Sequence, residues 1–225
     1  DNPRLEFVRA DIRDAHAMQR LCSDADAVVH MAAESHVDRS ISDAQPFVTT
    51  NVVGTQVLLD CWRSAHPPGA GPARFLHVST DEVYGSLPLD RREMRFREDT
   101  PLAPRSPYAA SKAASDLLVL AAQHTYGVDA VVTRCSNNFG PRQFPEKVIP
   151  LFVTNLIRGR RVPLYGDGLN VRDWLHVDDH CEALLAVLER GSTGEVYNIG
   201  GNNERANSEV TREILRIMGA GEDMI

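Results

Sequence analysis

Hydrophobic and polar positions follow two different periods along the chain. Short apolar runs typical of buried strands occur at residues 5–10, 26–33, 74–79 and 129–136. Between these runs, apolar residues recur at helical spacing at residues 15–22, 44–65 and 107–125. Polar connections are expected at 66–73 and 88–106. Strand–helix repetition at this spacing predicts βαβ units and a doubly wound parallel sheet, hence an α/β fold.

The pattern changes after about residue 140. Further helices are predicted at 146–159, 178–190 and 207–219, and short strands at 162–166, 172–177 and 195–201. We interpret residues 1–140 as a dinucleotide-binding portion and residues 141–225 as mainly a smaller, substrate-binding C-terminal lobe.

Composition narrows the class of protein. The 225 residues are 43% hydrophobic and 24% charged, as expected for a soluble globular domain with a sizeable core. The net charge of −7 argues against nucleic acid or an anionic membrane as partner. Four widely spaced cysteines predict reduced thiols in a cytoplasmic protein without a metal site. No signal peptide opens the chain, and no apolar run is long enough to span a membrane.

One predicted strand ends in a hydroxyl and two acids. In "RFLHVSTDEVYGS", Thr80, Asp81 and Glu82 directly follow the alternating apolar run at 74–79. Ligands of doubly wound sheets bind outside the carboxyl ends of the strands, so these side chains are candidates for acid–base chemistry. An ordinary polar turn, with Asp81 making an Asx turn and Glu82 solvated, is the alternative.

The next helix begins with "SPYAASK", in which Tyr108 and Lys112 are four residues apart. They therefore share a helix face. An ammonium beside a phenol favours the phenolate, which makes Tyr108 a candidate base for a hydroxyl proton. The same pair also occurs on plain amphipathic helices.

Small residues follow the second apolar run, in "HMAAESHVDRS" at 30–40. They either let an extended ligand approach the backbone or serve close strand–helix packing. His36 and Asp38 lack a third metal ligand at suitable spacing, so a polar loop is expected there.

Positive and amide side chains are scattered through the C-terminal part. Lys147, Arg172 and Asn207 could clamp a diphosphate, with the arginine forking to its oxygens. Alternatively, "YGDGLN" is only a turn that leaves Arg172 on the surface.

Together these segments resemble the extended short-chain dehydrogenase/reductase superfamily, and within it the dTDP-glucose 4,6-dehydratases. The resemblance rests on "RADIRD", "HMAAESHVDRSI", "TNVVGT", "STDEVYG", "SPYAASKAASD", "TRCSNNFGPRQFPEKVIP", "LYGDGLNVRDWLHVDDH" and "YNIGGNNE", in order over nearly the whole chain. It implies a Rossmann-like sheet with a smaller C-terminal lobe. Related epimerases place small or hydroxyl residues where Asp81 and Glu82 stand, so "TDEVYG" points to dehydration.

The resemblance also implies a reaction cycle for such a lyase. Tyr108, tuned by Lys112, takes the proton of the sugar 4-hydroxyl while hydride passes from C4 to tightly bound NAD+. Thr80 holds the 4-oxygen. Glu82 then removes the C5 proton and Asp81 protonates the leaving C6 hydroxyl, roles that two close acids fill by not ionising together. Hydride returns to C6, which gives dTDP-4-keto-6-deoxy-glucose.

Further site residues are implied by the same resemblance. The cofactor-binding set, besides Tyr108 and Lys112, would be Asp11, Ile12, Met31, Ala32, Ala33, Ser35, Thr50 and Asn138. The substrate-binding set would be Ser35, Thr80, Asn137, Lys147, Val148, Pro163, Leu164, Tyr165, Arg172 and Asn207. Family members usually form homodimers through two helices per subunit, here expected at 44–65 and 107–125.

The chain departs from this family at its start. Its first residues match the third strand of the family, and the GxxGxxG turn that places pyrophosphate on a helix N-terminus does not occur. The final "GAGEDMI" also stops before the family's last substrate-facing segment. We therefore expect a longer protein, with a truncated product as the alternative, and we expect these 225 residues alone to bind NAD+ poorly.

Two other functions remain as hypotheses. One is another NAD-dependent sugar-nucleotide epimerase or decarboxylase of the superfamily. The other is a non-catalytic fragment that only binds sugar nucleotides, which the missing glycine-rich turn would favour.

Overall fold

The computed structural model describes residues 2–67, 71, 73–87 and 94–225. Parts of the predicted connections 66–73 and 88–106 lie outside the described residues. The chain divides into two compact units, one made of Asp1–Arg134 with Ala186–Asn198 and the other of Cys135–Leu185 with Ile199–Ile225. Within the described part of the chain, no helix has both the length and the apolar character needed to cross a membrane.

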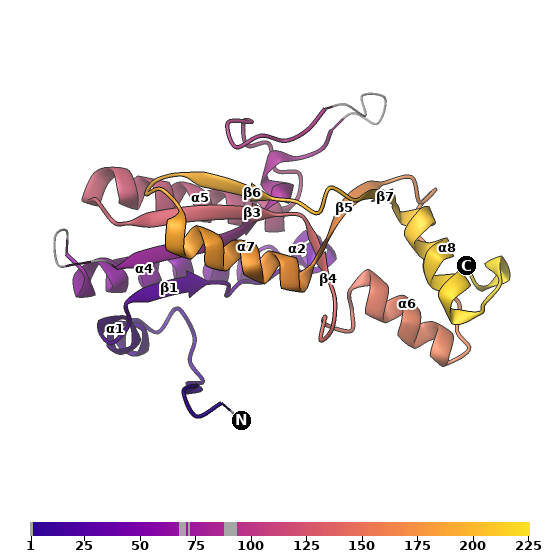
Figure 1. Ribbon diagram of the computed structural model, residues 1–225, viewed down its shortest axis with the longest axis horizontal. Coiled ribbons are helices and arrows are strands. Elements are labelled where there is room, and N and C mark those ends of the chain that lie inside the picture. Colours follow the sequence, from indigo (N-terminus) through magenta and orange to yellow (C-terminus); the bar gives the residue numbers. More distant parts are fainter. Residues whose placement is uncertain (1, 68–70, 72, 88–93) are drawn as a thin grey trace. The chain divides into compact units, whose positions relative to one another are not determined.

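The first unit is built on a four-stranded sheet. Its strands are β1 (Ala27–His30), β2 (Arg74–Thr80), β3 (Ala130–Cys135) and β6 (Val196–Ile199). They lie in the order β1-β2-β3-β6, and β1 pairs with β2 in parallel, Ala27 opposite Arg74. Each strand is followed or preceded by helices, as the sequence pattern predicted (Figure 1).

The helices of this unit pack against the sheet through one apolar cluster. They are α1 (Ala15–Ser23), α2 (Val37–Ser42), α3 (Gln45–Phe47), η1 (Val48–Gly54), α4 (Thr55–Ala65) and α5 (Pro107–Tyr126). The cluster joins α1, α4, α5 and two strands through Met18, Trp62, Val119, Phe75 and Val132. The helix predicted at 44–65 is confirmed as α3, η1 and α4 in succession, and η1 is a π-helix.

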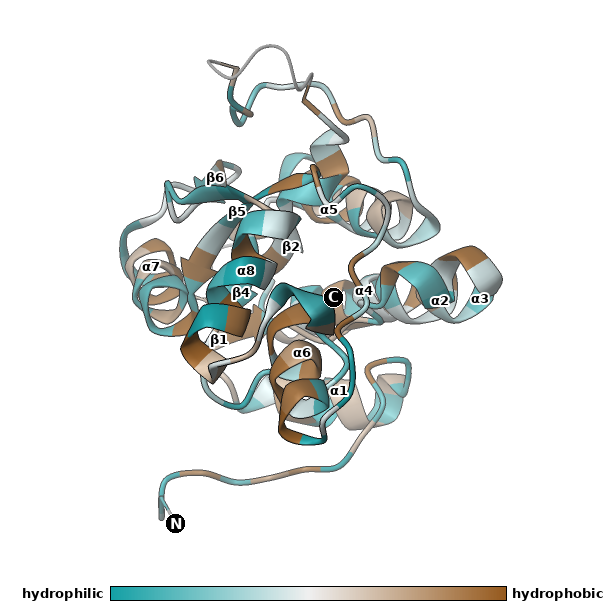
Figure 2. Cartoon of the chain, turned by 90° about the vertical axis from the view of Figure 1, so that its right-hand side faces the viewer, coloured by the Kyte–Doolittle hydropathy of each residue, from teal (hydrophilic) through white to brown (hydrophobic). Residues whose placement is uncertain are grey.

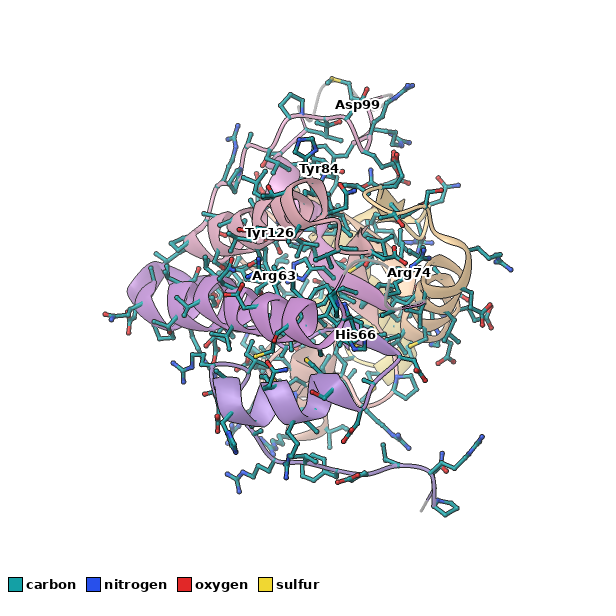
Figure 3. The ribbon with its side chains drawn as sticks, turned by 90° about the vertical axis from the view of Figure 1, so that its left-hand side faces the viewer. Arg63, His66, Arg74, Tyr84, Asp99 and Tyr126 are labelled. Atoms are coloured by element: carbon teal, nitrogen blue, oxygen red, sulfur yellow. The ribbon has the colours of Figure 1, made fainter. Side chains whose placement is uncertain are left out.

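Two helices of this unit also meet at their surface. Arg63 of α4 and Tyr126 of α5 lie side by side (Figure 3), with the guanidinium carbon 4.1 Å from the ring centre. This cation–π contact joins the C-terminal ends of α4 and α5.

Three expectations about local structure are wrong. Residues 5–10 are not a strand, because no strand in the described part of the chain pairs with them; Leu5 and Phe7 are 75% and 85% exposed. Asp38 belongs to a helix rather than a loop, and His36, at the end of the loop, caps this helix α2, because its imidazole accepts a hydrogen bond from Arg39 N. Residues 162–166 form no strand, because the backbone N–H of Val162 is bound to Met224 of the C-terminal turn.

The second unit contains a three-stranded sheet of order β4-β5-β7. Its strands are β4 (Asn137–Phe139), β5 (Val171–His176) and β7 (Glu204–Ala206), with β4 parallel and β7 antiparallel to β5. Helices α6 (Val148–Ile157) and α8 (Asn207–Met218) share an apolar cluster of Phe152, Val162 and Ile214, and Figure 2 shows the hydrophobic residues along α6. The short turn η3 (Glu222–Met224) follows α8.

The first unit also includes a later segment of the chain. Helix α7 (Val177–Arg190) begins in the second unit, and residues 186–198 belong to the first. The reason is that β6 is the outer neighbour of β3. Arg74 of β2 also donates hydrogen bonds to the last carbonyls of α7, those of Val187 and Leu188, which joins the end of this helix to the sheet.

Candidate active site

The segment after β2 is a single turn of 3-10 helix, η2 (Asp81–Tyr84), capped by Thr80. The Thr80 hydroxyl accepts a hydrogen bond from Glu82 N at 3.3 Å and donates to the Asp81 carboxylate at 3.4 Å. The predicted polar-turn alternative assigned the turn to Asp81, whereas Thr80 makes the cap. Asp81 and Glu82 are both half-buried.

Helix α5 carries the second candidate pair near its start. Ser106 caps the helix by accepting a hydrogen bond from Ala109 N, and Pro107 occupies its first turn. Lys112 is buried, and its ammonium donates to the Val78 carbonyl of β2 at 2.8 Å. Tyr108 is half-buried, and its ring makes an edge contact with Phe47 at 6.4 Å.

Packing brings these two groups of residues together. Val83 and Tyr84 of η2 are buried in one cluster with Ala113, the residue after Lys112. Lys112 itself is bonded to Val78, two residues before Thr80. The first unit therefore places the acid pair and the tyrosine–lysine pair on neighbouring segments at the carboxyl end of β2.

Two buried histidines, His30 and His77, lie near Lys112. The rings of His30 and His77 are 5.1 Å apart, and His30 bonds the Thr55 hydroxyl at 2.9 Å. Burial, with His77 and then Lys112 nearby, lowers the pKa of His30 to about 2; burial and then Lys112 lower the pKa of His77 to about 4. Both imidazoles are therefore neutral at pH 7, so Lys112, and neither histidine, supplies positive charge beside Tyr108.

Asn51 is a polar centre that the sequence analysis did not single out, although it lies in "TNVVGT". Its side chain is 1% exposed, accepts from Glu34 N, and donates to the Glu34 carbonyl and the Ser111 hydroxyl at 2.8–2.9 Å. Ser111 in turn donates to the Tyr108 carbonyl. Asn51 thus joins the loop after β1 to the first turns of α5. The sequence indicates this role only by placing a polar residue inside an apolar helical repeat.

The predicted cofactor residues of the first unit lie in three places. Asp11 is exposed and ion-paired with Arg13 at 2.7 Å, and the Arg13 hydrogen bonds lower the pKa of Asp11 to about 2. Ile12 is half-buried against Gly54, where an added Cβ would come within 2.5 Å of the isoleucine. Thr50 is half-buried on η1, and the loop after β1 holds the exposed Met31, Ala32 and Ser35 and the half-buried Ala33.

The predicted residues of the second unit are more open to solvent. Pro163, Tyr165 and Arg172 are exposed, as is Val148 at the start of α6, while Leu164, Lys147, Asn137, Asn138 and Asn207 are half-buried. Asn138 donates to the Ser136 carbonyl at 3.0 Å. Arg172 donates to the adjacent Val171 carbonyl.

Two backbone features organise this second set. Asn207 N and Ser208 N donate to the carbonyls of Asn170 and Gly168, which joins the start of α8 to the "GDGLN" turn. The Asp173 carboxylate accepts from Gly201 N at 2.7 Å and from Asn203 N at 2.8 Å. Asp173 is a second organising residue that the sequence analysis missed, because the amides that it binds are about 30 residues away.

No cluster of three or more His, Cys, Asp or Glu side chains suited to a metal ion occurs among the described residues.

Comparisons with known proteins show the family and the fold. The family model described as GDP-mannose 4,6 dehydratase matches residues 1–224. The dTDP-glucose 4,6-dehydratase of Streptomyces antibioticus is 57% identical over 225 residues, which are the whole chain and 64% of that protein. The chain thus spans about two thirds of the length of such relatives.

Solved structures confirm the α/β, Rossmann-like fold. The Streptomyces venezuelae dTDP-glucose 4,6-dehydratase DesIV, determined with NAD bound, matches with a TM-score of 0.93 and 54% identity, over 99% of this chain and 66% of that one. The UDP-glucuronic acid 4-epimerase of Bacillus cereus matches with a TM-score of 0.89 and 30% identity, over 98% and 68%. This chain belongs to the GDP-mannose 4,6 dehydratase family.

Proposed function

We propose that these residues are part of an NAD-dependent lyase that dehydrates dTDP-glucose to dTDP-4-keto-6-deoxy-glucose. The observation that carries this proposal is the acid pair of η2, half-buried and packed beside the helix that presents Tyr108 and Lys112. A dehydration needs both a base for the carbon-bound proton and an acid for the leaving hydroxyl. The 57% identity to a named dehydratase supports the same substrate and product.

Each side chain takes one step of the proton chemistry. Tyr108 removes the proton of the sugar 4-hydroxyl, and the buried Lys112 ammonium on the same helix face favours the phenolate. Thr80 holds the 4-oxygen. The ketone formed at C4 acidifies the C5 hydrogen, which Glu82 removes as a proton, while Asp81 protonates the C6 oxygen as it leaves as water. Glu82 returns the proton to C5 when hydride is added at C6.

Asp81 and Glu82 act in opposite protonation states. The role of base requires the Glu82 carboxylate to be ionised, and the role of acid requires the Asp81 carboxyl group to be protonated. The Thr80 hydroxyl touches both residues, through Glu82 N and the Asp81 carboxylate, and so fixes the start of the turn that carries them.

The residues of the first unit fit a nicotinamide dinucleotide. Small, exposed residues follow β1, the hydroxyls of Ser35 and Thr50 suit ribose, and the Lys112 ammonium suits a ribose diol or an anionic group. Asp11 and Ile12 would lie by the adenine, and Met31, Ala32 and Ala33 along the dinucleotide. When bound, NAD+ accepts the hydride that leaves C4 and returns it to C6. The pyrophosphate-binding GxxGxxG turn is not among these 225 residues.

The second unit would recognise the nucleotide diphosphate. Arg172 and Lys147 offer positive charge for its oxygens, and Asn137, Asn207 and the exposed 163–165 segment offer polar and aromatic contacts to the rest. The joined backbone of Asn170 and Asn207 supports this role by holding two of these segments in one place.

We also propose a cytoplasmic homodimer. None of the four cysteines forms a disulfide, which fits a reducing compartment. Exposed apolar residues on the two helices that were expected to dimerise, Val48 and Val53 on η1 and Leu117 on α5, support a second copy as the partner. Light scattering of Leu117→Arg against the wild type tests it, because the variant should shift toward monomer.

A substrate panel tests the proposed reaction. The holoenzyme should convert dTDP-glucose, without added reductant, to a product lighter by one water that carries a 4-keto group. An epimerase, which the structural likeness to UDP-glucuronic acid 4-epimerase makes the second candidate, would leave the mass unchanged, and a decarboxylase would release carbon dioxide from a UDP-uronate. A protein that binds dTDP-glucose and transforms none of these sugars would be the non-catalytic alternative.

A further inference from the structure

Tyr84, the last residue of η2, is held by hydrogen bonds at both sides of its hydroxyl. It is 3% exposed; its hydroxyl accepts from Arg134 Nη1 at 2.8 Å and donates to Asn198 Oδ1 at 2.8 Å. Its ring stacks on Phe96 at 5.0 Å, and Figure 3 labels it near the loop that leads to Asp99. A buried phenol with its donor and acceptor roles both satisfied has one defined position.

Arg134 connects this tyrosine to helix α5. Its Nε lies 2.9 Å from the Asp116 carboxylate, and the two side chains are 3% and 0% exposed. One guanidinium thus binds a carboxylate with one nitrogen and the Tyr84 hydroxyl with another, which its rigid planar fork allows. The second oxygen of Asp116 is 3.4 Å from His77 of β2, so the carboxylate contacts β2 as well.

The residues that tether the acid pair lie on the same face of α5 as the proposed base. Tyr108, Lys112 and Asp116 are at positions i, i+4 and i+8 of the helix. Lys112 holds the Val78 carbonyl before the acid pair, and Asp116, through Arg134, holds Tyr84 after it. The segment that carries Asp81 and Glu82 is therefore fastened at both ends to one helix face.

We infer that Asp116, Arg134 and Tyr84 are positioning residues that fix the η2 acids relative to Tyr108. The inference rests on the proposed function of Asp81 and Glu82. Proton transfer to and from carbon requires the catalytic groups to stay within about 0.5 Å of their productive positions. A looser η2 would therefore slow the removal of the C5 proton more than it slows the step that Tyr108 performs at the 4-hydroxyl.

Tyr84→Phe tests this inference, because it keeps the buried ring and its stacking on Phe96 and removes only the hydroxyl. In the holoenzyme acting on dTDP-glucose, kcat should fall by about 10- to 100-fold with KM within about twofold of the wild type. Deuterium at C5 of the substrate should give a larger isotope effect on kcat than in the wild type, while the effect of deuterium at C4 should not rise. A merely structural role would slow all steps alike and leave both isotope effects unchanged.

Tyr197→Phe is the matched control. The Tyr197 hydroxyl also accepts a hydrogen bond in the first unit, from Ser192 N at 2.7 Å, and this variant should keep the wild-type kcat and isotope effects. If Tyr84→Phe does not fold, Arg134→Lys decides by the same isotope effects, since it keeps a positive charge beside Asp116 and loses the fork that reaches Tyr84.

The outcomes separate this inference from the proposed function. The positioning role is overturned if Tyr84→Phe keeps the wild-type kcat, or if its kcat falls with unchanged isotope effects. In either case an inactive Glu82→Gln variant would leave the proposed function standing. Full turnover by Glu82→Gln overturns the proposed function itself, whatever Tyr84→Phe shows.

Discussion

The residues proposed to move protons in the first unit and those proposed to hold the nucleotide in the second are packed to different degrees. Thr80 and Lys112 are 8% and 4% exposed, and each is hydrogen-bonded to the segment that it positions. In the second unit, Tyr165 is 74% exposed and Arg172 donates to its neighbouring carbonyl. Thr80 and Lys112 of the first set are held by the fold, whereas Tyr165 and Arg172 of the second set are exposed to solvent.

This difference matches two different physical demands. Acid–base catalysis depends on fixed geometry, because misplacing a group by 1 Å costs up to about 100-fold in rate. Recognition of a flexible diphosphate tolerates side chains that settle on the ligand when it binds, at a cost in ordering entropy. We therefore expect substitutions in the first set to change kcat and substitutions in the second set to change affinity.

The largest effect should come from Glu82→Gln. Removing the proposed base should lower kcat by about 100- to 10,000-fold, measured as 4-keto-6-deoxy product formed from dTDP-glucose. NAD+ content, measured after gel filtration, should stay at the wild-type level because Glu82 is not in the proposed cofactor set. Glu182→Gln, an exposed carboxylate on α7, is the control and should be fully active. If Glu82→Gln turns over nearly as fast as the control, Glu82 is not the base, and the first set would not differ from the second in its effect on kcat.

Acid should destabilise the first unit through its buried histidines. His77 stays neutral in the folded state until pH falls to about 4, whereas an unfolded histidine takes up a proton near pH 6.5. As pH falls through this window the unfolded state binds the extra proton, so the free energy of unfolding should drop by about 1.4 kcal/mol per pH unit for this group. Urea unfolding between pH 7 and 4 measures the slope.

His77→Gln should flatten that slope by the contribution of one histidine. His180, whose pKa is lowered by burial in the second unit, supplies the comparison variant His180→Gln. An unchanged slope in His77→Gln would mean that His77 does not contribute to the pH dependence of the free energy of unfolding, which would contradict the prediction.

The smallest effect should be on nucleotide affinity. Arg172→Ala should raise the Kd for dTDP about tenfold, or about 1.4 kcal/mol, with an unchanged melting temperature, since this exposed side chain adds little to the fold. Isothermal titration of the holoenzyme measures it, with the exposed Arg158→Ala of the second unit as control. A fall in melting temperature without a change in Kd would mean that Arg172 is structural and would narrow the contrast between the two sets.

Much of this organisation follows from local patterns in the sequence. The apolar period predicts a helix at 107–125, which the structure shows as Pro107–Tyr126, and a strand at 129–136, found as Ala130–Cys135. The four-residue spacing of Tyr108 and Lys112 puts them on one helix face in any helix. The acids at the end of an apolar strand are equally a local feature. These predictions succeed because period and spacing depend only on neighbours in the chain.

Tertiary structure alone decided what holds these residues in place. The sequence places Lys112 34 residues from the Val78 carbonyl and Tyr84 50 residues from Arg134, yet each pair is joined by a hydrogen bond. The strand predicted at 5–10 is wrong for a related reason. An extended apolar segment becomes a strand only when another strand pairs with it, and the local sequence does not specify that partner. Periodicity specifies which face of an element is apolar, whereas the partner of a buried polar group depends on how distant segments pack.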